Sequence, residues 1–387
     1  MLYAEHGGNE SSGRILLDFS VNTNPYGMPR SVRKAAVLAV QHGESYPDIA
    51  CRQLREEICR YERSHFSGAE DLQPQQILTG NGASELIMAL AHASAKARVL
   101  LQSPLFSGYE RAFQAAGADI LYTQSGFGHA MSKQTQPGCG YALSEHTPSR
   151  ILDLRPDIAV LCHPGNPTGA MIPEALLRQI TQACICTGTL LAVDECFLPF
   201  VRDCRERSSA RFLQTGCNLV ILRAFTKLYA MPGIRLGYAV WSDQETADRI
   251  AGHLPEWNIS VQAQEAGLAA LREESYVAET TLRIRKERER LREALEAAGL
   301  VTVPGEANFI FLYSDTELYE PLLQRGILIR RCCNYHGIPE QGYYRIAVRK
   351  REENDRLLEA LTQILQGKDA AVEKIRQGRE TDTEETR

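Results

Sequence analysis

The chain has 387 residues, of which 44% are hydrophobic and 24% are charged, and it carries a formal net charge of −5. This is the composition of a globular protein of two or three domains, and it excludes a mainly disordered or collagen-like chain. The acidic balance argues against nucleic-acid binding, and no apolar run reaches the roughly 20 residues of a membrane-spanning helix.

The N-terminus and the cysteines indicate the compartment. The first 14 residues, MLYAEHGGNESSGR, have no basic flank followed by an apolar stretch, so we expect no signal peptide. Eleven cysteines in a chain of this length then favour reduced thiols over a disulfide scaffold. No Cys-x-x-Cys occurs, and His129, His146 and His163 are scattered, so we expect no metal site. We expect a cytoplasmic protein.

Short apolar runs alternate with helix-like segments through the first two thirds of the chain. Helical patterns cover residues 83–97 and 173–187. The expected buried strands are residues 76–79, 97–102, 118–123, 158–162, 190–193 and 219–222. Strand, helix and strand in series predict right-handed crossovers and a mainly parallel sheet. Such sheets bind ligands beyond the carboxyl ends of their strands.

The pattern changes after Ser260. Residues 260–298 are rich in charge pairs and predict one or two long helices that lead into a smaller domain with strands at 308–313 and 343–348. We divide the chain into an N-terminal arm with part of the small domain (1–45), a large domain (46–284), a small α+β domain (285–367) and a charged, flexible tail (368–387). The glycine- and polar-rich stretch 126–144 is expected to be a surface excursion.

The strongest local chemical signal lies in residues 221–238, ILRAFTKLYAMPGIRLGY. Lys227 follows a buried strand, where burial lowers the pKa of an amine and makes it a better nucleophile. Thr226 offers a hydroxyl beside it. Arg235, eight residues on, offers a guanidinium fork that suits phosphate.

Three further segments should meet this one at the sheet edge. Gly82, Ala83 and Ser84 open a helix, whose free backbone amides and serine hydroxyl make an anion site. Asn166 lies in a Pro- and Gly-rich turn after the strand 158–162. Asp194 closes another strand, where it could be a metal ligand, an ion-pair partner or the acid that keeps a pyridinium nitrogen protonated.

These segments, in this order, resemble a known family. Asn-Pro-Thr-Gly at 166–169, Asp-Glu at 194–195 and Thr-Lys at 226–227 form the signature of the class I/II aminotransferases, which are fold-type I pyridoxal-phosphate enzymes. The resemblance covers residues 14–365. It implies an α/β fold, with a mainly parallel sheet sandwiched by helices in the large domain, and a smaller α+β domain. It also implies pyridoxal 5'-phosphate as cofactor and a homodimer with shared active sites.

The resemblance implies roles around the cofactor. Lys227 forms the covalent bond to pyridoxal phosphate, Asp194 pairs with the pyridinium nitrogen, and Asn166 hydrogen-bonds the ring's phenolate oxygen. Phe106 stacks on the ring unless Tyr109 takes that place. The residues assigned to the cofactor phosphate are Gly82, Ala83, Ser84, Thr226 and Arg235, with Tyr46 reaching in from a second subunit.

Further residues are assigned to a small phosphorylated amino-acid substrate. Arg345 and Arg330 supply positive charge for its carboxylate and phosphate, although Arg331 could point inward in place of Arg330. Arg349 lies four residues beyond Arg345 and would share its strand face, so we expect it in the same anion site. The remaining substrate-binding residues are His6 and Asn22, on the N-terminal arm, and Asn166.

The ends of the chain narrow the choice within the family. His-Gly-Gly-Asn at 6–9, residues 17–25 and Arg-Ile-Ala-Val-Arg at 345–349 resemble the threonine-phosphate decarboxylases of cobalamin biosynthesis. Phe197 stands where many aminotransferases have a tyrosine, which favours the same branch. The implied reaction converts L-threonine O-3-phosphate into (R)-1-aminopropan-2-yl phosphate and carbon dioxide.

Other activities stay open at this point. L-Serine O-phosphate, one methyl smaller, would give ethanolamine phosphate. Histidinol-phosphate aminotransferases share the Asn-Pro-Tyr-Gly and Tyr-Pro-Asp elements found at 24–27 and 46–48. A pyridoxal-phosphate-binding regulator would carry a DNA-binding domain, for which we expect no room before residue 14.

Overall fold

The computed structural model describes residues 15–123 and 143–384. Its largest sheet has seven strands in the order β2-β8-β7-β6-β5-β3-β4. The strands are β2 (Ile77–Gly80), β3 (Arg98–Leu101), β4 (Asp119–Tyr122), β5 (Ile158–Cys162), β6 (Leu190–Asp194), β7 (Leu219–Ala224) and β8 (Gly237–Trp241). Only β8 is antiparallel to its neighbours in this sheet, β2 and β7. The predicted α/β fold with a mainly parallel sheet is confirmed.

The central strands are apolar throughout because both faces of the sheet are covered. In β5, Ala159 and Leu161 join one apolar core, whereas Ile158, Val160 and Cys162 join the other. Successive side chains point to opposite faces of a strand, so an unbroken apolar run suits a strand between two helical layers.

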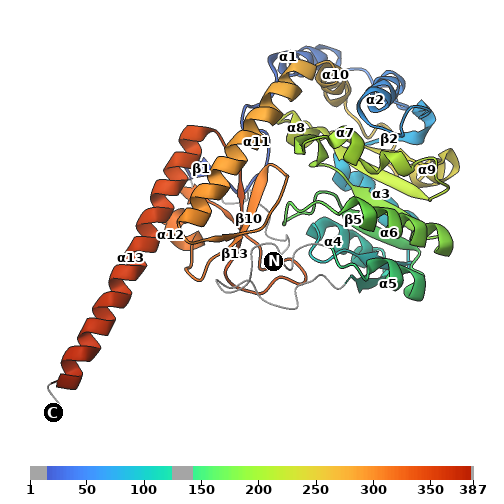
Figure 1. Cartoon of the computed structure of the whole chain (residues 1–387). Coiled ribbons are helices and arrows are strands. Elements are labelled where there is room, and N and C mark those ends of the chain that lie inside the picture. Colours follow the sequence, from blue (N-terminus) through green and yellow to red (C-terminus); the bar gives the residue numbers. More distant parts are fainter. Residues whose placement is uncertain (1–14, 124–142, 385–387) are drawn as a thin grey trace.

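Two helical layers cover this sheet (Figure 1). The first contains α3 (Ala83–Ala93), α4 (Ser107–Ala115) and α9 (Gln244–Ala251). The second contains α2 (Arg52–His65), α5 (Thr147–Leu154), α6 (Glu174–Thr187) and α10 (Val261–Ala270), against which α1 (Arg30–Ala39) packs. The helix expected at 83–97 thus ends four residues early. The remaining helices of the large domain are short. They are α7 (Cys204–Arg207), α8 (Phe225–Leu228) and four 3-10 turns, Val40–His42, Pro74–Gln76, Leu198–Phe200 and Ser209–Phe212.

The small domain holds a four-stranded sheet in the order β12-β13-β10-β9. Its strands are β9 (Val301–Thr302), β10 (Phe309–Tyr313), β12 (Arg330–Arg331) and β13 (Tyr343–Ala347), and its helices are α11 (Glu274–Ala297), α12 (Tyr319–Gln324) and α13 (Arg351–Glu384). The N-terminal β1 (Leu17–Asp18) pairs in parallel with β11 (Ile327–Leu328). Helix α11 runs without a break across residue 284, where the boundary between the large and small domains is predicted. The division of the chain into domains stays a prediction.

The C-terminal segment is helical, and its expected flexibility stays a prediction. Helix α13 continues to Glu384, beyond residue 368, and extends away from the body of the molecule (Figure 1). Glu, Lys, Arg, Gln and Ala dominate this segment, and all of them favour helix even without an apolar face. Within the described ranges, no helix is long and apolar enough to cross a membrane. In the same ranges, no three His, Cys, Asp or Glu side chains gather as metal ligands would.

Candidate active site

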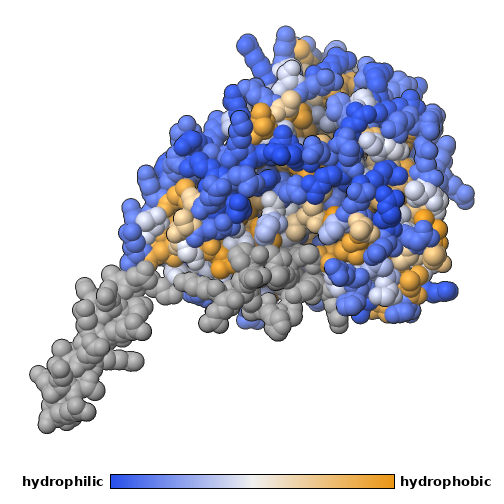
Figure 2. All heavy atoms as spheres, viewed as in Figure 1, coloured by the Kyte–Doolittle hydropathy of each residue, from blue (hydrophilic) through white to orange (hydrophobic). Residues whose placement is uncertain are grey.

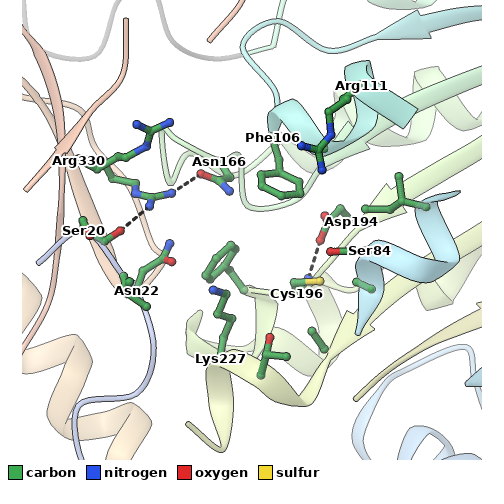
Figure 3. Close-up of a pocket in the computed structure, with 18 of the residues that line it drawn as sticks. Ser20, Asn22, Ser84, Phe106, Arg111, Asn166, Asp194, Cys196, Lys227 and Arg330 are labelled. Carbon is green, nitrogen blue, oxygen red and sulfur yellow. Dashed lines mark hydrogen bonds between the residues drawn. The ribbon is translucent and has the colours of Figure 1, made fainter. Parts of the chain in front are cut away.

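A cavity of about 430 Å³ opens at the carboxyl edge of the large sheet, against the small domain. Figure 3 shows Lys227 and Phe106 reaching into it from opposite sides, with Asp194 and Ser84 toward one end and Arg330 and Ser20 toward the other. The predicted residues that line it are Asn22, Ala83, Ser84, Phe106, Asn166, Asp194, Thr226, Lys227, Arg235, Arg330 and Arg345. The structure therefore brings together segments that are far apart in sequence.

Lys227 is held in place by its backbone. Strand β7 ends at Ala224, and Lys227 lies in the short helix α8 that follows. The Asn24 amide donates to the Lys227 carbonyl at 2.9 Å, and its side-chain Nδ2 donates to the Leu228 carbonyl at 2.9 Å. Burial, with the nearby guanidiniums of Arg345 and Arg235, lowers the pKa of Lys227 to about 8. A larger fraction of this amine is therefore in the neutral, nucleophilic form near pH 7 than of an ordinary lysine.

Asp194 is the last residue of β6 and is held by two hydrogen bonds. Its Oδ1 accepts from the Cys196 amide at 3.0 Å, and its Oδ2 accepts from the Tyr109 hydroxyl at 3.0 Å. Burial raises the pKa of Asp194, and the hydrogen bonds from Cys196 and Tyr109 oppose that rise. A carboxylate so deeply buried gains most from a cation placed beside it, such as a protonated pyridine ring.

Tyr109 is therefore a partner of Asp194 and does not line the cavity, whereas Phe106 does. The two rings meet edge to face, with centroids 6.4 Å apart and an interplanar angle of 90°. Of the two aromatic residues left open by the sequence, Phe106 is the one placed to stack on a ligand ring.

The start of α3 forms a site for a phosphate group. Gly82 precedes the helix with φ +76°, and a Cβ there would lie 2.4 Å from the Arg235 guanidinium. Glycine therefore lets Arg235 approach the first turn, where the backbone amides of Ala83 and Ser84 have no intrahelical acceptor. With the Thr226 hydroxyl, which lines the same cavity, these groups supply hydrogen-bond donors and positive charge suited to a phosphate.

The opposite end of the cavity is cationic. Arg345 is buried, and its two terminal nitrogens donate to Asn166 Oδ1 at 2.7 Å and to the Ser20 carbonyl at 2.9 Å. Its Nε, like Asn22 Nδ2, has no hydrogen-bond partner in the part of the chain that the structure describes. A buried guanidinium whose hydrogen bonds go to neutral oxygens favours binding of an anion. Arg330 lies directly opposite Arg345 in the β12–β13 register.

Arg349 is not where the sequence analysis placed it, and its expected place in the anion site is wrong. Strand β13 ends at Ala347, so the alternation that starts at Arg345 does not reach Arg349. Its guanidinium instead contacts Glu353 at 2.6 Å. Arg331, the alternative to Arg330, pairs with Glu320 at 2.6 Å and does not line the cavity.

Two other predicted residues lie outside the cavity of this chain. Tyr46 is 80% exposed and packs against Trp257, with ring centroids 4.8 Å apart. That position neither places Tyr46 at its own chain's site nor tests a role in a second subunit. His6 lies outside the described residues.

The sequence analysis missed several lining residues. Cys196, Arg111, Ser20 and Tyr335 all face the cavity, and Tyr335 donates to Asn166 Oδ1 at 3.5 Å. Cys196 could have been predicted as a lining residue, because it directly follows the Asp-Glu pair at 194–195. Arg111 lies on α4 and carries no local signal of its own. Tyr335 belongs to the small domain and reaches the site only because the two domains meet there.

The fold and this set of donors define a pyridoxal-phosphate-dependent enzyme. The buried amine of Lys227, the acid Asp194 and the phosphate site at α3 match the aldehyde, the ring nitrogen and the phosphate of pyridoxal 5'-phosphate. When bound, this cofactor supplies a cationic ring that stabilises negative charge developing at the substrate Cα.

The chain belongs to the aminotransferase class I and II family, whose model matches residues 14–361. It is 34% identical to the threonine-phosphate decarboxylase of Salmonella typhimurium, over 94% of this chain and 97% of that protein. It is 32% identical to histidinol-phosphate aminotransferase 2 of Archaeoglobus fulgidus, over 90% and 93%. Among solved structures, the histidinol-phosphate aminotransferase of Clostridium acetobutylicum matches with a TM-score of 0.79 and 28% identity, over 91% of this chain and 100% of that one.

Proposed function

We propose that the protein decarboxylates L-threonine O-3-phosphate, giving (R)-1-aminopropan-2-yl phosphate and carbon dioxide, the step in cobalamin synthesis that the resemblance implies. The observation that carries this proposal is the pair of buried guanidiniums of Arg330 and Arg345 at the end of the cavity away from Asp194. A substrate with both a phosphate and a carboxylate uses two cations, and each interaction is a charge-assisted hydrogen bond. The similarity to the Salmonella decarboxylase supports the same reaction.

Orientation of the substrate decides between decarboxylation and transamination. The bond at Cα that breaks must lie perpendicular to the cofactor ring, and in this reaction it is the bond to the carboxylate. An arginine that anchors the substrate phosphate can turn that bond out of the ring plane and hold it there. The Lys227 amine lines the same cavity, and we assign to it the return of a proton to Cα.

The second candidate is a histidinol-phosphate aminotransferase, favoured by the similarity to the Archaeoglobus and Clostridium proteins. Histidinol phosphate has a phosphate but no carboxylate, so it leaves one of the two arginines without an anion. Serine phosphate has both groups and lacks only one methyl of threonine phosphate, a difference worth about 1–3 kcal/mol of discrimination.

A turnover panel tests the proposal. The cofactor-loaded protein is mixed with threonine phosphate, serine phosphate, or histidinol phosphate plus 2-oxoglutarate, and both carbon dioxide and glutamate are measured. We expect carbon dioxide from threonine phosphate, less from serine phosphate, and no glutamate. Glutamate formation from histidinol phosphate without any carbon dioxide release would assign the chain to the second candidate.

Arg330 provides a sharper test of phosphate anchoring. We expect Arg330→Ala to lower kcat/KM for threonine phosphate on the order of 100-fold, because a charged hydrogen-bond donor to the substrate is lost. Arg331→Ala is the matched control, since the adjacent Arg331 pairs with Glu320 outside the cavity. Full turnover in Arg330→Ala would remove the anchoring role.

We further propose that the enzyme is a homodimer in which Tyr46 serves the partner's cofactor phosphate. Val37, Val40, Tyr46 and Ile49 are at least half exposed near the α1–α2 connection, an apolar surface that association would cover. Mixing inactive Lys227→Met with a Tyr46→Ala variant should then restore activity, because mixed dimers contain one intact site. An active monomer in gel filtration would contradict this arrangement.

A further inference from the structure

A second hollow, with a volume of about 890 Å³, lies between α11 and the loop that follows β9. It shares no lining residue with the active-site cavity. Hydrophilic side chains gather over α11 on the face drawn in Figure 2. The lining of the hollow also includes apolar side chains, namely those of Ala170, Met171, Leu282, Val303 and Pro304. We call this hollow the α11 groove.

The charged side chains of the α11 groove are mainly cationic. Residues 285, 286, 289 and 292 come from one side of α11, because positions three, four and seven apart share a helix face. Five cationic and two anionic side chains line the groove, namely Arg202, Arg285, Lys286, Arg288 and Arg292, with Glu289 and Glu306. The chain as a whole has a net charge of −5, so this excess of positive charge is local.

Both carboxylates of the groove are already paired. Glu289 lies 2.9 Å from Arg288 and 3.3 Å from Arg292, and Glu306 lies 2.6 Å from Arg207, outside the lining. Three of the five cations are therefore left without a carboxylate partner within the described ranges. Among the described residues, Arg202, Arg285 and Lys286 have no carboxylate within ion-pair distance.

Arg285 is the most crowded of these three cations. It is half-buried, and its one hydrogen bond goes to the Val201 carbonyl at 3.3 Å. Burial lowers the pKa of Arg285, and the guanidiniums of Arg202 and Arg288 lower it further, whereas Cys204 and Asp203 act in the opposite direction. An anion in the groove would relieve this repulsion, as it would in any cluster of like charges held at close range.

We propose that the α11 groove binds a nucleoside triphosphate. The three unpaired cations match the negative charge of a polyphosphate chain, and guanidinium forks suit phosphate oxygens. The apolar part of the lining, with Met171 and Leu282, suits a flat heterocyclic base. The site is independent of the reaction at Lys227, so its test does not depend on the decarboxylase proposal.

The test is a calorimetric titration of the cofactor-loaded full chain with ATP in EDTA. We expect saturable binding that weakens as salt is raised, and at least tenfold weaker binding in the Arg285→Gln/Lys286→Gln variant. A second variant, Arg202→Gln, removes a lining cation that lies outside α11 and should weaken binding by about threefold or more. Arg178→Gln, which removes an exposed arginine of α6, should leave the affinity unchanged.

The same titration is repeated with two other ligands, tripolyphosphate and adenosine. Tripolyphosphate should bind more weakly than ATP, and adenosine should not bind, if both the cations and the apolar lining contribute. Tripolyphosphate that binds as tightly as ATP would overturn the assignment of a nucleoside. Absence of ATP binding, or binding that none of the groove variants weakens while circular dichroism shows them folded, would overturn the site itself.

Discussion

Lys227→Met should abolish covalent attachment of pyridoxal phosphate and lower turnover by on the order of 10³-fold or more. The visible absorbance band of the lysine-bound cofactor should be absent from the purified variant. Lys227 is the lysine among the cavity's lining residues, and its pKa of about 8 gives a usable fraction of neutral amine near pH 7. No other lining side chain offers an amine to replace it.

The pH dependence of attachment follows from the same lowered pKa. In cofactor-free protein, the rate of attachment should rise with pH through about 8, because only the neutral amine attacks an aldehyde. The stability of the cofactor-free protein should also rise with pH. Between pH 8 and 10.5 the unfolded chain binds a proton at this lysine that the folded chain does not bind, so the free energy of unfolding rises with pH.

The methionine variant should lack this rise and should be more stable than the cofactor-free parent at pH 7, by up to about 3 kcal/mol. Denaturant unfolding at pH 7 and pH 10 measures both effects, and absorbance with turnover measures attachment. Lys34→Met, which changes an exposed lysine of α1, is the matched control and should alter none of these quantities. Turnover that survives in Lys227→Met would remove this lysine from the reaction.

The sequence was sufficient to predict the sheet edge and much of the site on it. Unbroken apolar runs mark strands buried on both faces, and their ends place Asp194, Asn166 and Lys227 at one edge whatever the details of the loops. The order of these motifs therefore carried three-dimensional information. The expected position of Ser84 follows from the same logic, since a helix begins where a strand of this kind ends. Arg235 lies just before β8, so this logic does not apply to it.

Other features depend on contacts that no local pattern encodes. Arg349 leaves the strand face because Asn354 binds its backbone, with Oδ1 accepting from the Arg349 amide at 3.1 Å and Nδ2 donating to its carbonyl at 2.9 Å. This interaction lies between β13 and α13, at a boundary that apolar periodicity does not locate. Tyr109 likewise finds Asp194 across 85 positions of sequence, through the packing of α4 on the sheet.

A buried ionic cluster behind the site is a further feature of this kind. Arg223, on β7, lies 2.8 Å from Glu62 and 3.1 Å from Glu195, and all three side chains are at most 4% exposed. The Phe66 ring lies 3.6 Å from the guanidinium carbon. Burial lowers the pKa of Arg223, but the carboxylates of Glu62 and Glu195 raise it by more. The pKa of Arg223 therefore lies above its usual value. The cluster thus joins β7 to the residue that follows Asp194.

Replacing Arg223 with methionine should destabilise the protein by about 3–5 kcal/mol, since it leaves two carboxylates buried without their cation. Such carboxylates take up protons in the folded state at a pH where the unfolded chain has lost them. The free energy of unfolding of the variant should therefore fall, relative to the parent, as the pH rises from 5 to 8. Denaturant unfolding at both pH values measures this.

Adding Glu62→Gln and Glu195→Gln to Arg223→Met should recover part of the lost stability, because neutral amides cost less to bury than unpaired charges. Arg178→Met is the matched control, since it breaks an exposed pair with Glu174 that should contribute no more than about 1 kcal/mol. A pH-independent loss in Arg223→Met would mean that lost packing against Phe66 dominates, and the ionic account would fail. Because Glu195 adjoins Asp194 and Arg223 precedes Lys227 by four residues, a loss of the predicted kind would also loosen the two strand ends that hold the acid and the amine in register.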